Sequence, residues 1–194
     1  MAIGFVASNQ LFIPDKTLAR TQAPRVRTQK FGDGYEQRLT EGINNINDSF
    51  TLSFVNKPKL EADDLYAFFE AQAGVTAFDF TYPDTNSTST TTAQLSSAPS
   101  NSLVLALTTI NLDISVGASV TGTGVDGTPK VTKNHAPFTN ITVDTEQTIN
   151  NGTVLTFTNP NERKIKVVCD SWTINYSNSD HYNIQTQFRR VYEP

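Results

Sequence analysis

A turn core at Phe31–Tyr35, with the sequence FGDGY, constrains the fold of this chain more than any other segment. Asp33-Gly34 suits the positive φ angles that a two-residue β-hairpin loop requires, and its extended flanks lie within Arg27–Phe54. The aromatic residues on both sides of the turn are expected to pin it. The sequence therefore predicts a hairpin against which later parts of the chain pack.

The segment after the hairpin predicts a half-buried strand. Between residues 48 and 56, Phe50, Leu52 and Phe54 occupy alternate positions, so their side chains share one face of an extended chain. An apolar face of this kind needs a cover, which we expect from the next segment of the chain.

An amphipathic helix over residues 59–73 is expected to supply that cover. Pro58 suits the start of a helix, acidic residues follow where the helix dipole favours them, and Gly74 provides the stop. Apolar residues recur at three- and four-residue spacing as far as Ala73 and form one stripe. The predicted core comprises Phe50, Leu52, Phe54, Leu65, Phe68, Phe69 and Trp172.

The composition changes abruptly at Thr85. From there to about Pro160, roughly one residue in three is Ser or Thr, and short runs keep a two-residue period at the spacing of a small β-sandwich. We predict an inserted, immunoglobulin-like all-β domain over 85–160. A disordered Ser/Thr-rich linker is the alternative, but it suits only 85–101, which we expect to be a flexible leading segment. Residues 1–84 and 161–194 would then be two halves of one domain.

The charge is balanced overall but not locally. A formal net charge of -4 gives no global indication of nucleic-acid binding. No acidic residue lies between Asp15 and Asp33, whereas this interval holds a basic set: Arg20, Arg25, Arg27 and Lys30. This basic set is either a solvated strand edge, where Lys and Arg discourage stray pairing, or a surface that faces an acidic partner or DNA.

The sequence lacks the constellation of residues that a catalytic site needs. His135 and His181 lie in polar, turn-like stretches and are expected at the surface, while Asp33 has a structural reason to be in an Asp-Gly turn. Cys169 is the only cysteine, which excludes an intrachain disulfide and a cysteine-based zinc site, and it is expected to be a small buried residue. Phosphate-binding and dinucleotide-binding glycine motifs are missing too. We therefore predict no enzyme activity, no cofactor and no metal site.

Membrane insertion is not expected either. No segment of the sequence approaches the roughly 20 apolar residues that span a bilayer. The first residues lack the basic start and the long apolar run of a signal peptide. The sequence therefore predicts a protein that is made and folded in a cytoplasm.

Three segments resemble the minor tail proteins of long-tailed bacteriophages, typified by lambda tail protein M. They are VRTQKFGDGYEQRLTEGINN at 26–45, LYAFFEAQAGVTAFDFTYPD at 65–84 and KIKVVCDSW at 164–172, and they keep the family's order. The chain departs from the family where Phe-Thr-Tyr-Pro at 80–83 replaces a Trp-Thr-Pro-Pro stretch. The insertion that follows has no counterpart in the family's short members.

The resemblance implies a structural virion protein at the distal end of the tail, built like a tail tube subunit. Its fold would be a β-sandwich or split barrel flanked by an α-helix. It would form a homo-oligomeric, hexameric ring that joins the tail tube protein to the tail-tip or baseplate-hub protein. The tape measure protein and DNA would pass through its lumen, and assembly would take place in the host cytoplasm. The insertion would decorate the outside, because a domain in the lumen would block the channel.

The hairpin is the predicted site of inter-subunit or ring-to-ring contact, and the alternative is that it only folds the monomer. Two other classes of function remain open: a carbohydrate-binding or host-adhesion module, suggested by the Thr-rich β composition, and a cell-wall hydrolase, for which paired carboxylates are missing. The predicted contact residues are Arg25, Arg27, Lys30, Phe31, Gly32, Asp33, Gly34, Tyr35 and Arg38, with Arg38 pairing across the interface.

Overall fold

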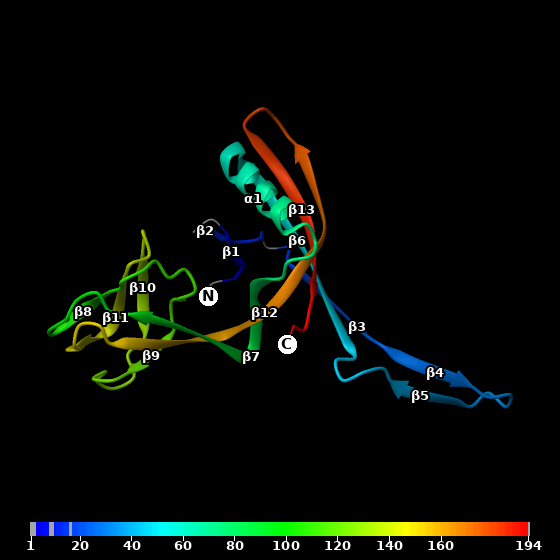
Figure 1. Ribbon diagram of the computed structural model, residues 1–194, viewed down its shortest axis with the longest axis horizontal. Helices are drawn as coiled ribbons and strands as arrows, with labels where there is room; N and C mark the ends of the chain where they lie inside the picture. Colours follow the sequence, from blue (N-terminus) through cyan, green and yellow to red (C-terminus); the bar gives the residue numbers. More distant parts are fainter. Residues whose placement is uncertain (1–2, 8–9, 16, 194) are drawn as a thin grey trace. The chain divides into compact units, whose positions relative to one another are not determined.

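The computed structural model describes residues 3–7, 10–15 and 17–193 (Figure 1). Within these residues the protein consists of strands and a single helix, which confirms the predicted mainly β fold with one helix. The strands are β1 (Phe5–Ala7), β2 (Gln10–Phe12), β3 (Ala19–Pro24), β4 (Val26–Lys30), β5 (Glu36–Thr40), β6 (Ile46–Pro58), β7 (Phe78–Gln94), β8 (Ser102–Ala106), β9 (Ser119–Gly122), β10 (Val131–His135), β11 (Asn140–Gln147), β12 (Val154–Tyr176) and β13 (His181–Arg190). The helix is α1 (Lys59–Gln72).

The chain folds into two compact units. The Ser/Thr-rich unit combines Met1–Ile13 with Asp79–Ile165, and the helix unit combines Pro14–Phe78 with Lys166–Pro194. These bounds differ from the predicted division into 1–84 plus 161–194 and 85–160. One physical reason is a reciprocal pair of backbone hydrogen bonds between Gly4 and Thr81, at 2.9 and 2.8 Å, which ties the start of the chain to β7.

The helix unit is an antiparallel sheet in the order β3-β6-β13-β12, with α1 packed against it. β13 lies at its centre and pairs with β6 on one side and with the second half of β12 on the other. The ring of Phe69 on α1 lies 5.9 Å from that of Phe188 on β13 and 6.1 Å from that of Trp172 on β12. Each such aromatic pair adds about 0.5–1.5 kcal/mol beyond the burial of apolar area.

The residues predicted as core lie in this packing. Those that are fully buried are Phe50, Leu52, Phe54, Leu65 and Phe69, while Phe68 and Trp172 are half-buried at the margin of α1. Ala73, expected at the end of the apolar stripe, is instead exposed. It ends the helix in the left-handed conformation, with φ 49°, and its amide donates to the carbonyl of Phe69 at 3.0 Å.

The Ser/Thr-rich unit contains a three-stranded sheet, β10-β11-β8, and the first half of β12, which pairs with β9 and β7. One apolar cluster draws buried residues from both sets of strands: Ala93, Leu95, Leu105, Leu107, Ile114, Ala118, Val120, Val131, Ile141, Val143, Ile149, Leu155 and Phe157. The expected flexible segment 85–101 is strand as far as Gln94. The strand β12 likewise continues through residues 160 and 161, where a domain boundary was expected.

Candidate functional site

The β4–β5 hairpin forms an exposed arm, which we define as residues 25–44. The two strands pair antiparallel from Val26 and Thr40 to Lys30 and Glu36, and every residue from 19 to 44 is exposed. Figure 1 shows the hairpin running away from the sheet of the helix unit. An isolated two-stranded hairpin is only marginally stable in water. The arm is therefore the strongest candidate for a contact surface.

The tip of the arm is not the predicted two-residue loop. The amide of Phe31 donates to the carbonyl of Tyr35 at 2.8 Å, and the amide of Gly34 donates to the carbonyl of Phe31 at 3.2 Å, so residues 32–34 form the loop. Gly34 has a φ of 81°. A three-residue loop that ends in a left-handed glycine is a common hairpin connection. A Cβ atom on Gly32 or on Gly34 would meet no atom within 4 Å, so the loop depends on Gly34 only because of its positive φ.

One face of the arm, the charged face, brings opposite charges together. Residues directly opposite one another in an antiparallel pair share a face, which places Lys30 with Glu36. The guanidinium of Arg38 also contacts the Glu36 carboxylate. Within this chain Arg38 makes this contact inside β5, and its pairing with another subunit stays a prediction.

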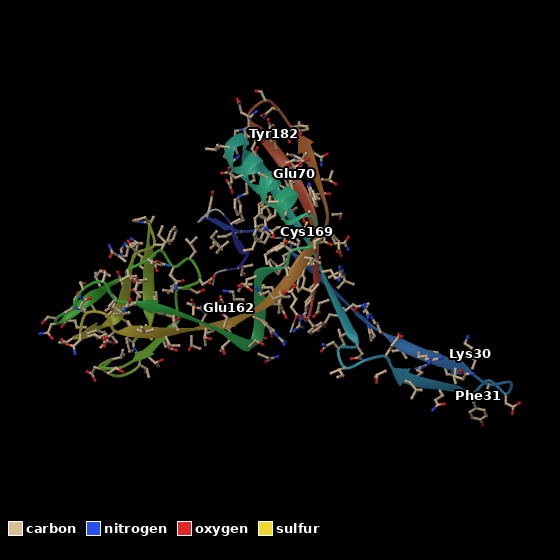
Figure 2. The ribbon with its side chains drawn as sticks, viewed as in Figure 1. Lys30, Phe31, Glu70, Glu162, Cys169 and Tyr182 are labelled. Atoms are coloured by element: carbon tan, nitrogen blue, oxygen red, sulfur yellow. The ribbon has the colours of Figure 1, made fainter. Side chains whose placement is uncertain are left out.

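The opposite face, the aromatic face, combines exposed apolar and aromatic side chains with polar ones. Arg27 lies opposite Leu39, Gln29 lies opposite Gln37, and the strand alternation places Phe31 and Tyr35 on the same side. Figure 2 shows the side chains of Lys30 and Phe31 on opposite sides of the arm. Phe31, Tyr35 and Leu39 are 52%, 74% and 53% exposed. Within the described part of the chain, the side chains of Phe31, Tyr35 and Leu39 have no ion pair or side-chain hydrogen bond such as the one between Arg38 and Glu36.

A buried carboxylate, which no sequence pattern indicated, stabilises the base of the arm, where the hairpin joins the sheet. Asp48 on β6 accepts hydrogen bonds from Arg20 Nε at 3.0 Å and Gln22 Nε2 at 2.8 Å on β3, and from Arg190 Nη1 at 3.1 Å on β13. Burial alone would raise the pKa of Asp48, but these hydrogen bonds and the charge of Arg20 together hold it below its ordinary value. We call this set the Asp48 clamp.

The clamp also divides the predicted basic set. Arg20 is bound to Asp48 and lies over the ring of Phe50, with 5.9 Å between its guanidinium carbon and the ring centroid. Arg25, Arg27 and Lys30 lie on the exposed arm. The four basic residues therefore do not form one surface, because Arg20 has a structural role.

A second buried carboxylate lies in the Ser/Thr-rich unit. Glu162 on β12 is 1% exposed and accepts hydrogen bonds from Ser89 Oγ at 2.7 Å and Ser115 Oγ at 3.0 Å. Asn159, also on β12, accepts from the Ser115 amide and donates to Ser89 Oγ. These hydrogen bonds tie β7 and β12 to the loop at 113–115, which gives the network a structural role.

The two histidines and the cysteine occupy positions that have a structural explanation. His135 ends β10 with Nε2 2.7 Å from Thr142 Oγ1, and His181 begins β13; both are half-buried at strand ends rather than in turns. Cys169 is buried as predicted, and burial raises the pKa of its thiol. Among the described residues, no three His, Cys, Asp or Glu side chains gather as a metal site would require. The helix found in them is too short and too polar to cross a membrane.

Residues 11–112 match the model of a family described as phage minor tail protein. The chain belongs to the phage minor tail protein family. The match spans just over half of the chain, includes the arm and α1, and ends within the Ser/Thr-rich segment. No curated protein matches the chain. This minor tail protein is therefore a structural component of a phage tail, located in the tail of the virion, where it contacts other tail proteins.

Proposed function

We propose that this minor tail protein forms a hexameric ring at the distal end of the tail tube and joins the tube to the tip or baseplate hub. A closed ring of identical subunits with head-to-tail contacts needs two different complementary faces on each subunit. The arm supplies a protruding face with exposed strand edges. A neighbouring subunit or ring can cover such edges by continuing the sheet.

The observation that carries this proposal is the uninterrupted exposure of residues 19–44. Phe31, Tyr35 and Leu39 remain in water in the isolated chain, although each has a large apolar surface. A contact with a neighbour removes that surface from water and orders a hairpin that has little stability by itself. The alternative, an arm that only folds the monomer, leaves this exposure unexplained.

In this proposal the Ser/Thr-rich segment decorates the outside of the tail, and the lumen stays free for DNA and the tape measure protein. Its aromatic side chains give little support to a carbohydrate-binding or host-adhesion role. Phe157 is fully buried and Phe138 is half-buried, and residues 85–160 contain no other aromatic residue. A spacer or partner-docking role therefore agrees better with the residues present.

Deletion of residues 32–34 tests the proposal, with the Gly32→Ala variant as the control for a change at the tip. We expect the deleted chain to keep the wild-type thermal transition but to fail to enter tails, as measured by mass spectrometry of purified particles. Electron microscopy of wild-type tails should show a ring of this chain at the distal end. Normal tails with the deleted chain, or loss of its thermal transition, would contradict the interface role.

A further inference from the structure

The outer face of α1 matches the aromatic face of the arm in charge and length. On the inner side of the helix, Ala62, Leu65 and Phe69 are buried. The opposite side presents a continuous exposed stripe at helical spacing: Leu60, Asp63, Asp64, Ala67, Glu70 and Ala71. Leu60, the second residue of the helix, is 77% exposed and supplies the largest apolar side chain of this stripe.

The charges of the two faces are complementary. Within its paired residues 27–31 and 35–39, the aromatic face carries Arg27 as its one charged residue, and Arg25 and Glu41, of opposite charge, follow at the base of the arm. The stripe on α1 carries three carboxylates and no basic residue. Lys59, at the start of the helix, lies by Tyr182, with 6.0 Å between its Nζ and the ring centroid, and its charge is also attracted by Asp63. The same chain therefore carries a basic face with apolar residues on the arm and an acidic face with apolar residues on α1.

The two faces also match in length. From Arg27 to Phe31 the strand advances four residues, or about 13 Å at about 3.3 Å per residue. From Glu70 to Leu60 the helix rises ten residues, or about 15 Å at 1.5 Å per residue. When Phe31 and Tyr35 lie on Leu60, Arg27 therefore reaches Glu70. The amides of Gln29 and Gln37, about 7 Å along the strand, then lie at the level of Asp64, about 6 Å along the helix.

We infer that the aromatic face of the arm packs on the outer face of α1 of a second copy of this chain, with Arg27 paired to Glu70. Figure 1 shows the arm leaving the sheet in a direction away from α1, so one copy does not bring its own two faces together. The contact is of the head-to-tail kind, since it joins two different faces. This inference rests on the proposed ring and names the surface that the arm contacts in it.

A photo-crosslinker at Tyr35 tests the contact in assembled tails. Phage are produced with p-benzoylphenylalanine at position 35, irradiated, and digested for mass spectrometry. The expected product joins position 35 to residues 60–71 of a second copy, and the same probe at Thr28 on the charged face gives no such product. Adducts to a different tail protein, to another segment or within one copy would overturn the inference, as would the absence of any adduct.

Charge reversal tests the Arg27–Glu70 pair independently. The Arg27→Glu and Glu70→Arg variants should each enter tails at least about tenfold less than wild type, because each places like charges together. The double variant restores the pair with its polarity reversed and should recover to within about threefold of wild type. Single variants that assemble normally, or a double variant as defective as the singles, would overturn the pairing.

The same preparations separate this inference from the proposed function. Wild-type tails that contain a ring of the chain, but whose crosslinks map elsewhere, contradict the arm–helix contact and leave the ring standing. Tails that lack a ring of the chain contradict the proposed function itself.

Discussion

Replacement of Asp48 by asparagine should destabilise the helix unit by about 3 kcal/mol, the lower end of the range for removing one partner of a buried ion pair. The Asp48 side chain is 2% exposed and accepts hydrogen bonds from Arg20, Gln22 and Arg190 at 2.8–3.1 Å. Asparagine keeps the shape but loses the charge, and its amide group places a donor against donors. The root of the arm is then held by fewer and weaker contacts.

The fluorescence of Trp172 can measure this loss of stability in the helix unit itself. It is the only tryptophan and lies on β12 within the helix unit, so its fluorescence reports the unfolding of that unit. For a chain of this length 1 kcal/mol corresponds to about 2–4 °C, so the Asp48→Asn variant should melt about 6–12 °C below wild type.

Asp170→Asn is the matched control. It removes a half-exposed ion pair with Arg189 Nε at 3.1 Å and should cost less than about 1 kcal/mol. If the Asp48→Asn and Asp170→Asn variants lose equal stability, burial of the Asp48 clamp does not determine its contribution, and the reasoning is refuted.

The effect should also depend on pH. Burial alone would raise the pKa of Asp48, but its hydrogen bonds to Gln22, Arg190 and Arg20 leave it below the ordinary value of 3.8. A depressed pKa in the folded state contributes stability above the unfolded pKa, and that stability is lost as the pH falls through the folded pKa. The difference between wild type and Asp48→Asn should therefore be constant above about pH 5 and shrink below about pH 4. A difference that persists unchanged to about pH 2 would contradict this.

Three further predictions concern backbone strain and the core. Gly34→Ala should destabilise the arm by about 1–2 kcal/mol, because its φ is 81°, while Gly32→Ala costs less than about 0.5 kcal/mol; amide hydrogen exchange in the arm measures both, and equal effects would contradict the loop assignment. Ala73→Gly should stabilise the chain by about 1 kcal/mol, since φ at this position is 49°, and an unchanged melting temperature would show that the left-handed cap is unstrained. Phe157→Ala should cost about 3–5 kcal/mol in circular-dichroism melts because its ring is fully buried, against less than about 0.5 kcal/mol for the exposed Val154→Ala; similar losses would mean that the apolar cluster is not a packed core.

Local sequence patterns predicted the strand β6 and the helix α1 of the helix unit well. The alternate positions of Phe50, Leu52 and Phe54 are buried on one face of β6, and α1 spans nearly the residues that its apolar spacing indicates. In both elements the side-chain period records directly which face is buried. Such a period can be recognised without knowing which strand or helix packs against the segment.

The domain boundaries could not be found in the same way. Strand β7 buries Ser89 and Ala93 at alternate positions, and small or polar inward residues leave no apolar period to detect. In β12 the buried positions change phase at Pro160 and Asn161, where Asn161 has a φ of 58°. A proline and a local irregularity look like the end of a strand in the sequence, although the strand continues.

Sequence patterns predicted the arm but not the Asp48 clamp, because only the arm is formed by one local segment. The arm follows from a local turn, but Asp33-Gly34 fits both a two-residue loop and the three-residue loop that forms, and local sequence does not distinguish them. The Asp48 clamp joins residues 20, 48 and 190, and which charges meet depends on strand order and register. That information is not contained in any single segment.

The exposure of the arm has a consequence for how long an unassembled subunit survives. Arg25, Arg27, Lys30 and Arg38 all lie in this accessible hairpin, and each is a cleavage point for trypsin-like proteases. In the proposed ring the same peptide bonds are covered. We therefore expect an unassembled copy to be cut in the arm more readily than a copy held in a tail.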